Sequence, residues 1–223
     1  MKNSIPFLII LLLLCTCDAK QETKIISRSD ALPPLLKKDK LYKYITNTNQ
    51  WIVIHHSAFF TQPGIKTLYF YHTRKLKYND IGYHFVILKN GDIHEGRSIN
   101  YMGAHAGQTK EANEIAGKIR SDKLDIPITE ALKLDPDFGA IGICLDGNFN
   151  YYAPNRDQLT SLKKLLKYLI DNYHIKIGHI ILHQDVKEEM VEPKGLHFLG
   201  KETECPGFRA VKKIHSIINS IHY

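Results

Sequence analysis

Apolar residues occur in short runs separated by amphipathic stretches, which indicates alternating strands and helices. Residues 51–56 (WIVIHH) and 140–147 (AIGICLDG) are rich in apolar β-branched residues and predict buried strands. Residues 156–173 repeat leucine at helical spacing and predict the clearest helix, which Asn155 or Asp157 could cap.

The remaining patterns complete an alternating order of elements. Residues 65–77 and 208–223 have apolar stripes of amphipathic helices. Residues 81–97 predict a hairpin with a type I′ turn at Asn90-Gly91, and residues 176–186 predict a strand that ends near His183. We therefore expect an α/β (α+β) domain with a central mixed β-sheet flanked by helices.

Two further segments interrupt this order. Residues 108–138 are polar and partly helical in pattern, so we expect an inserted excursion. Residues 1–17 have a basic start and an apolar run too short to span a bilayer, which is typical of an export signal. Residues 18–40 are polar and predict a linker, and residues 41–223 then form the folded domain.

The end of the signal contains cysteines. The stretch LLCTC loosely resembles a lipobox, and Cys17 is the better candidate for lipidation because Leu14 and Thr16 precede it suitably. Lipidation there would anchor the protein to a membrane, whereas simple secretion is the alternative. We expect an exported protein, periplasmic or associated with the cell envelope.

Charge and the other cysteines narrow the choice of partner. The net charge of +7 fits an anionic cell envelope or simply a soluble surface, and no nucleic-acid-binding motif is present. Cys144 and Cys205 could form a disulfide. The alternative is a buried thiol at Cys144 and a metal ligand at Cys205, which the motifs below favour.

Candidate metal ligands fall at strand ends and in a nearby loop. His55, His183 and Cys205 form a His, His, Cys set, and zinc hydrolases use three protein ligands with a fourth position for water. His55 and His56 are neighbours on a strand, so they cannot both face one site. His179 remains a rival to His183, because the two histidines would share one face of a strand.

Five ordered blocks between residues 50 and 215 carry a family resemblance. They are IVIHHSA, DIGYHFVILKNGDIHEGR, GAHA with IGICLDGNF, LHQDV and TECPGF. The sequence resembles the zinc-dependent N-acetylmuramoyl-L-alanine amidases of the type 2 amidase and peptidoglycan-recognition-protein superfamily, which includes the phage T7 lysozyme.

The resemblance implies a role for particular residues. It selects His55, His183 and Cys205 as zinc ligands, with His183 preferred over His179. Tyr83 would lie near the scissile carbonyl, and Thr203 would hydrogen-bond the developing oxyanion as a weaker electrophile than the lysine of the phage type.

Other positions are assigned less directly or depart from the family pattern. His105, Arg97 and Asn148 are candidates to line a substrate groove, although Arg97 could equally be structural. Some relatives carry a glutamate where Cys144 stands, so that base is absent here. The segment between LHQDV and TECPGF is longer than in the family, so the loop over the site is expected to differ.

The implied function is hydrolysis of the amide between N-acetylmuramic acid and the L-alanine of a peptidoglycan stem peptide. The partners would be peptidoglycan or muropeptides, and we expect a monomer. The alternative is a non-catalytic recognition module, although such proteins usually lose the metal cysteine that Cys205 preserves here. A serine hydrolase based on Ser57 is disfavoured because no G-x-S-x-G motif surrounds it.

Overall fold

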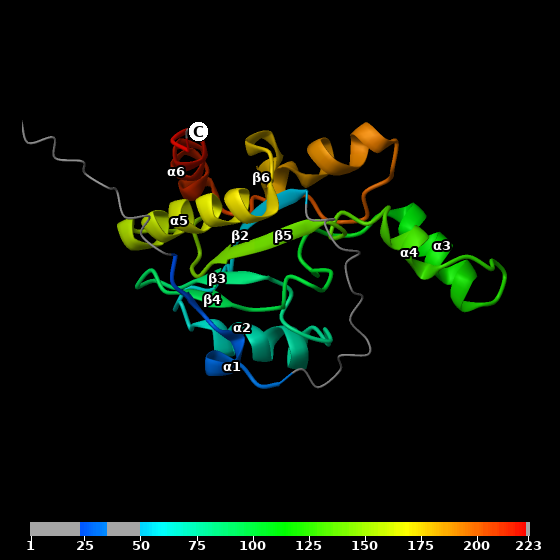
Figure 1. The fold of residues 1–223 in the computed structure, drawn as a ribbon, viewed down its shortest axis with the longest axis horizontal. Coiled ribbons are helices and arrows are strands. Elements are labelled where there is room, and N and C mark those ends of the chain that lie inside the picture. Colours follow the sequence, from blue (N-terminus) through cyan, green and yellow to red (C-terminus); the bar gives the residue numbers. More distant parts are fainter. Residues whose placement is uncertain (1–22, 35–49, 222–223) are drawn as a thin grey trace, which may run out of the picture.

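The computed structural model describes residues 23–34 and 50–221, which form a six-stranded mixed sheet covered by helices (Figure 1). Along the sheet the strands follow the order β1-β4-β3-β5-β2-β6. The strands are β1 (Ile25–Ile26), β2 (Trp51–His56), β3 (Phe85–Ile87), β4 (Ile93–Glu95), β5 (Ala140–Leu145) and β6 (Ile180–Leu182). The predicted α/β class is confirmed.

The two strands at the centre of the sheet carry the first elements of the site. β2 pairs in parallel with β5 and with β6, and His55 lies opposite Cys144 in the β2–β5 register. β3 pairs in parallel with β5 and antiparallel with β4. The parallel strands at the centre bring their carboxyl ends to one edge of the sheet, which is where the polar side chains collect.

Helices cover both faces of the sheet. The longer helices, α5 (Arg156–Tyr173) and α6 (Phe208–Asn219), pack on one face over a core of aliphatic residues. On the opposite side lie α1 (Arg28–Ala31) and α2 (Ile65–Phe70), which continues as a π-helical turn, Tyr71–Lys75. Of the two predicted caps, Asn155 caps α5, and it also forms a capping box with Gln158.

The excursion at residues 108–138 contains two short helices at one end of the sheet. They are α3 (Lys110–Arg120) and α4 (Ile128–Leu132), and Figure 1 shows them projecting beyond the strands. Between the second and third ligand segments, residues 187–194 form the turns Lys187–Val191 and Glu192–Lys194. Residues 108–138 and residues 187–194 therefore both contain helical structure.

Three local predictions are wrong. The hairpin turn is not type I′, because Asn90 does not have a positive φ; its loop has three residues and ends in left-handed Gly91. The 176–186 strand is restricted to β6, since helical turns Ile177–His179 and His183–Asp185 flank it. Finally, Leu76 is 41% exposed and does not belong to the buried stripe of its helix.

The expected linker over residues 18–40 is also wrong for its described part. β1 adds a parallel strand to β4, and Ala31 and Leu32 are buried against α2. Arg28 fixes this segment by an ion pair of 2.8 Å with the buried carboxylate of Asp80. The export signal, Cys17 and the rest of the linker lie outside the described residues. Among the helices of residues 23–34 and 50–221, none has the length and apolar character needed to cross a membrane.

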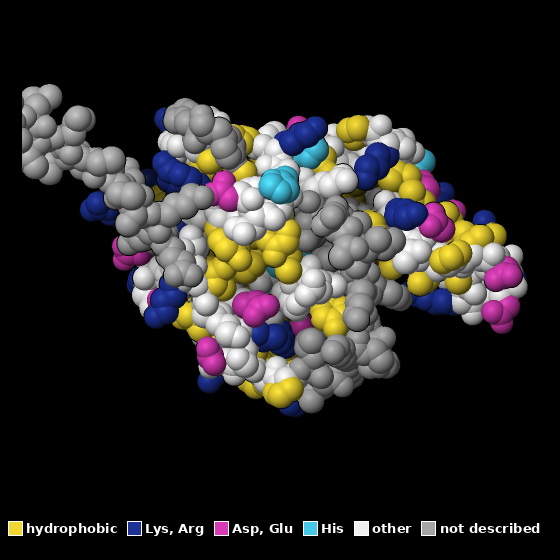
Figure 2. Space-filling view, in the orientation of Figure 1, with side chains coloured by type: hydrophobic (Ala, Val, Ile, Leu, Met, Phe, Trp, Pro, Cys, Tyr) yellow, Lys and Arg dark blue, Asp and Glu magenta, His cyan; other side chains and the backbone are white. Residues whose placement is uncertain are grey.

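The surface charge is mixed on the face drawn in Figure 2. Lys and Arg side chains are spread across that face among Asp and Glu side chains, rather than gathered in a single patch. The charged side chains visible on this face are therefore mixed in sign.

Candidate metal centre

Alternation along β2 separates the two neighbouring histidines, as the sequence predicts. His56 points toward the α5 and α6 side, where its ring lies 5.9 Å from the Phe149 ring and its Nδ1 accepts a hydrogen bond from the Phe149 N–H at 3.1 Å. His55 points to the other face, beside the rings of Tyr83 and His183. One imidazole therefore serves the core and the other serves the site.

Three side chains from distant parts of the sequence meet at the end of the sheet. The candidate ligand atoms of His55, His183 and Cys205 all lie within 4.8 Å of one another. His55 Nδ1 is 3.8 Å from Cys205 Sγ, and the His55 and His183 ring centroids are 4.4 Å apart. His183 is only half-buried, so the group opens toward solvent on its side.

Backbone contacts bring the two later segments together. The backbone N–H of Gln184, next to His183, donates to the Cys205 carbonyl at 2.9 Å. Asp185 closes the turn after β6 by accepting from the Leu182 N–H at 3.3 Å. The His56 N–H donates to Cys205 Sγ at 3.4 Å, which joins the third segment to β2.

The donor chemistry of this group fits a tetrahedral divalent ion. In such a site with two imidazoles and one thiolate, the donor atoms lie about 3.4 to 3.6 Å apart. The His55 Nδ1–Cys205 Sγ pair, at 3.8 Å, is close to this, and all three ligand atoms lie within 4.8 Å of one another. Burial lowers the pKa of His183 to about 4 and lowers that of His55, so both rings are neutral and keep a lone pair. Burial also raises the pKa of the Cys205 thiol to about 12, so it needs a cation beside it to become a thiolate.

His179 is not part of this group. Its ring stacks on Trp51 with centroids 4.1 Å apart, and its Nδ1 lies 3.1 Å from the Gln50 carbonyl, at the opposite end of β6. The rival pair of His179 and His183 on one strand face is therefore wrong, because a helical turn and not a strand contains His179. Cys144 and Cys205 are both free thiols, so the disulfide alternative is wrong as well.

Two polar side chains border the metal group. The Tyr83 ring lies 5.1 Å from the His55 ring, and burial, reinforced by Cys144, raises the pKa of its phenol well above the ordinary value. Tyr83 is thus a neutral donor. The Thr203 hydroxyl accepts from the Cys205 N–H at 3.1 Å, which leaves its own proton for donation.

The three residues expected to line a groove have different surroundings. The His105 side chain is completely buried behind His55, with its Nδ1 3.1 Å from His55 Nε2. Arg97 is buried and donates to the carbonyls of Ile81 and Met102, although it also borders a pocket of about 330 Å³ beside α3 and α4. Asn148 is buried and donates to the Ala58 carbonyl at 3.1 Å.

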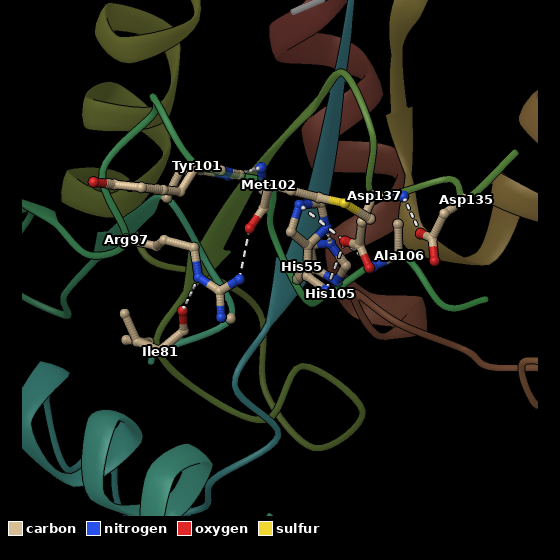
Figure 3. Close-up of polar contacts among 12 residues, drawn as sticks. His55, Ile81, Arg97, Tyr101, Met102, His105, Ala106, Asp135 and Asp137 are labelled. Atoms are coloured by element: carbon tan, nitrogen blue, oxygen red, sulfur yellow. Dashed lines mark hydrogen bonds and ion pairs between the residues drawn. The ribbon is translucent and has the colours of Figure 1, made fainter. Parts of the chain in front are cut away.

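For His105, substrate contact is therefore wrong, because no part of its side chain reaches solvent. Substrate binding by Arg97 or Asn148 stays a prediction. Asp137 was not among the predicted site residues, and its carboxylate lies behind His105 (Figure 3). Its position just before β5, in the stretch DPDFG, gave no specific signal.

Comparison with known proteins identifies the family. Residues 46–208 match the sequence model of the family described as N-acetylmuramoyl-L-alanine amidase, which is well over half of the chain. This chain belongs to the type 2 amidase and peptidoglycan-recognition-protein superfamily. The prediction of the family from the five sequence blocks is confirmed.

Curated relatives of this amidase-family chain include peptidoglycan-recognition proteins of flies. It is 27% identical over 223 residues to peptidoglycan-recognition protein SC2 of Drosophila simulans, covering 95% of this chain and 96% of that protein. It is 30% identical over 126 residues to protein SD of the same species. The latter match covers 56% of this chain and spans about half of the relative's length, 53%.

Solved structures show the same fold. Drosophila PGRP-LB superimposes with a TM-score of 0.59 at 22% identity, covering 86% of this chain and 93% of that chain. The N-acetylmuramoyl-L-alanine amidase LysC from Clostridium intestinale superimposes with a TM-score of 0.54 at 24% identity, covering 88% and 97%. This amidase-family member thus has the fold found in both recognition proteins and amidases.

Proposed function

We propose that this protein is a zinc-dependent amidase that hydrolyses the bond between N-acetylmuramic acid and L-alanine in peptidoglycan. The observation that carries this proposal is the convergence of His55, His183 and Cys205, with their ligand atoms within 4.8 Å of one another. A purely recognising protein has no need for a cysteine buried beside two neutral imidazoles.

Each residue of the site has a role that fits this reaction. His55, His183 and Cys205 would hold zinc, which when bound polarises a carbonyl and acidifies water. Tyr83, kept protonated by burial, donates a hydrogen bond to the developing oxyanion or orients the attacking water. Thr203 offers a second donor beside Cys205.

The second candidate is recognition without catalysis. It is favoured by the names of the relatives, several of which are peptidoglycan-recognition proteins. One solved neighbour, peptidoglycan recognition protein LE, is described in complex with tracheal cytotoxin, a monomeric diaminopimelic acid-type peptidoglycan. By this analogy muropeptides are the proposed ligands under either function.

Digestion of purified peptidoglycan separates the two functions. We expect free stem peptides with an unblocked L-alanine amine, detected by mass spectrometry, and their loss when EDTA is added. A protein that contains stoichiometric zinc and binds muropeptides, but releases no stem peptide, would establish recognition and reject catalysis.

Compartment and anchoring are part of the proposal. We propose an exported, envelope-associated monomer, on the basis of the apolar run in residues 1–17 and the lipobox-like Cys17. Mass spectrometry of the mature N-terminus tests this, because diacylglycerol on Cys17 indicates an anchor and a plain cleaved terminus indicates secretion. An uncleaved terminus would contradict export.

A further inference from the structure

The imidazole of His55 uses both of its nitrogens. Its Nδ1 faces Cys205 Sγ at 3.8 Å, and its Nε2 lies 3.1 Å from His105 Nδ1 in the interior. A neutral imidazole carries one proton, so a nitrogen that donates a hydrogen bond leaves the other as a lone-pair donor. If His55 Nε2 donates to His105, Nδ1 is free to coordinate the metal.

The His105 ring must have the complementary tautomer to accept that proton. If its Nδ1 accepts from His55, its own proton lies on Nε2, which is 3.5 Å from Asp137 Oδ1 (Figure 3). This distance is long for a hydrogen bond. The Ala140 backbone is a hydrogen-bond partner of the His105 ring, and Asp137 holds the residue through its backbone N–H. In this arrangement both imidazoles carry their proton on Nε2, and His55 Nδ1 is left with its lone pair.

The carboxylate oxygen that faces His105 is itself held firmly. Asp137 Oδ1 accepts from the backbone N–H of His105 at 2.7 Å and of Ala106 at 2.9 Å, and the Asp137 N–H donates to Asp135 Oδ1 at 2.9 Å. Two backbone donors fix Oδ1 as an acceptor whether or not the carboxyl is ionised. This makes the position of Asp137 independent of its protonation.

The His105 ring has no room to turn. A Cβ atom added at Gly142 on β5 or at Gly103 would overlap the ring, so the two glycines form a slot around it. His84 packs edge-on against it, with centroids 5.6 Å apart, and is fixed through the Gly142 N–H at 2.9 Å. The ring is thus positioned by backbone on two sides.

We propose that His105 and Asp137 are positioning residues that fix the tautomer and orientation of His55, so that Nδ1 is the metal ligand. This inference rests on the proposed function in one respect, that the site binds a metal; it does not require catalysis. Hydrogen bonding to the non-coordinating nitrogen of a metal-bound histidine typically contributes about 10- to 100-fold in metal affinity or activity. His105 is therefore not a substrate-binding residue and not a buried histidine without function.

Two substitutions at one position test the proposal. Asn places an amide oxygen close to where Nδ1 lies and can still accept from His55, whereas Leu has a similar volume and no acceptor. We expect His105→Leu to weaken zinc affinity, measured by competition with a chromophoric chelator, by about 10- to 100-fold. His105→Asn should restore affinity to within a few-fold of the wild type.

Nuclear magnetic resonance of the metal-free protein provides a readout independent of activity. Long-range ¹⁵N correlations should show His55 as the Nε2–H tautomer in the wild type and in His105→Asn, but a mixture of tautomers in His105→Leu. Asp137→Asn, which retains an acceptor for the two backbone N–H groups, should cause a smaller mixture. Urea unfolding of each metal-free variant tells whether the fold is retained.

Two outcomes would overturn the proposal. The first is equal zinc affinity in His105→Leu and wild type, and the second is equal loss in His105→Leu and His105→Asn, which indicates a purely structural role. A wild-type protein that binds zinc but has no amidase activity would reject the proposed function and leave this inference standing, because neither measurement requires turnover.

Discussion

The two faces of β2 differ in how many buried polar side chains surround them. On the side of α5 and α6, Ile52 and Ile54 pack into an aliphatic core, and His56 is the polar exception, satisfied by one backbone N–H. On the other side, His55 is surrounded by His183, Tyr83 and further polar groups. Adjacent residues of one strand therefore serve stability and chemistry separately.

The comparison shows what a buried polar cluster requires. A core of leucine and isoleucine needs only volume and shape, whereas each nitrogen and oxygen on the site face needs a partner. The site face obtains these partners from segments far away in sequence, at residues 105, 137, 183 and 205. Its geometry therefore depends on the whole fold.

The largest effect should come from replacing each of the two adjacent histidines in turn. His55→Ala removes one of three ligands, and we expect zinc binding and amidase activity to fall to background. His56→Leu removes only the acceptor of the Phe149 N–H, so it should retain stoichiometric zinc while losing about 1 to 3 kcal/mol of stability. Zinc content by atomic emission and urea unfolding are the measurements. Zinc loss in His56→Leu alone would reverse the assignment of the two faces.

A second variant sharpens the chemistry of the site face. Tyr83→Phe keeps the ring against His55 but removes the donor, so kcat should fall about 10²- to 10³-fold with zinc content unchanged. Tyr151→Phe, at a residue 64% exposed, is the matched control and should have wild-type kcat. Unaltered kcat in Tyr83→Phe would remove this tyrosine from the mechanism.

The apolar face should respond in stability alone. Leu166 on α5 is completely buried, so Leu166→Ala should cost about 2 to 5 kcal/mol of unfolding free energy. The neighbouring exposed residue gives the control, since Lys167→Ala should change stability by no more than about 0.5 kcal/mol. Zinc affinity should be unchanged in both folded variants, and a parallel loss of affinity would show that the faces are coupled.

A smaller effect is the dependence of stability on pH, to which His72 on the site side of the sheet contributes. Burial, and then the charge of Arg97, lower the pKa of His72 to about 4, and its Nδ1 accepts from the Gly82 N–H at 2.8 Å. Between its ordinary pKa of about 6.5 and 4, the unfolded chain binds this proton and the folded chain does not, so acid favours unfolding.

The non-titrating variant His72→Asn isolates this contribution. Metal-free wild type should lose up to about 1.4 kcal/mol per pH unit more than His72→Asn as the pH falls from 6.5 toward 4. Urea unfolding at pH 7, 6 and 5 measures the slopes. Identical slopes in wild type and His72→Asn would show that His72 is protonated in the folded state.

The sequence predicted the elements with strong local signals and the ligands carried by ordered motifs. The helix at residues 156–173 has a clear apolar period and a cap, and its predicted bounds agree with the structure. The selection of His183 required the family resemblance, because local pattern alone did not exclude His179. Alternation on a strand was enough to separate His55 from His56.

Features that depend on tertiary contacts could not be predicted. Ile25 and Ile26 are flanked by polar residues in the sequence, and they form a strand because they pair with β4 at the edge of the sheet. Asp137 lies in a polar excursion with no recognisable motif, and its role becomes visible only when His105 is placed against it. His105 was expected to line a substrate groove, but its ring lies against Gly103 and against Gly142 of β5. Only the fold brings Gly142 next to this ring.

The central claim is that one divalent ion is held by two imidazoles and one thiolate. Cobalt(II) substitution tests it most directly, because a cobalt–thiolate bond produces an intense near-ultraviolet charge-transfer band and tetrahedral cobalt absorbs strongly in the visible. We predict both features at one equivalent of cobalt in the wild type, with the charge-transfer band lost in Cys205→Ser. A weak octahedral spectrum, or a wild-type spectrum that Cys205→Ser leaves unchanged, would contradict the account.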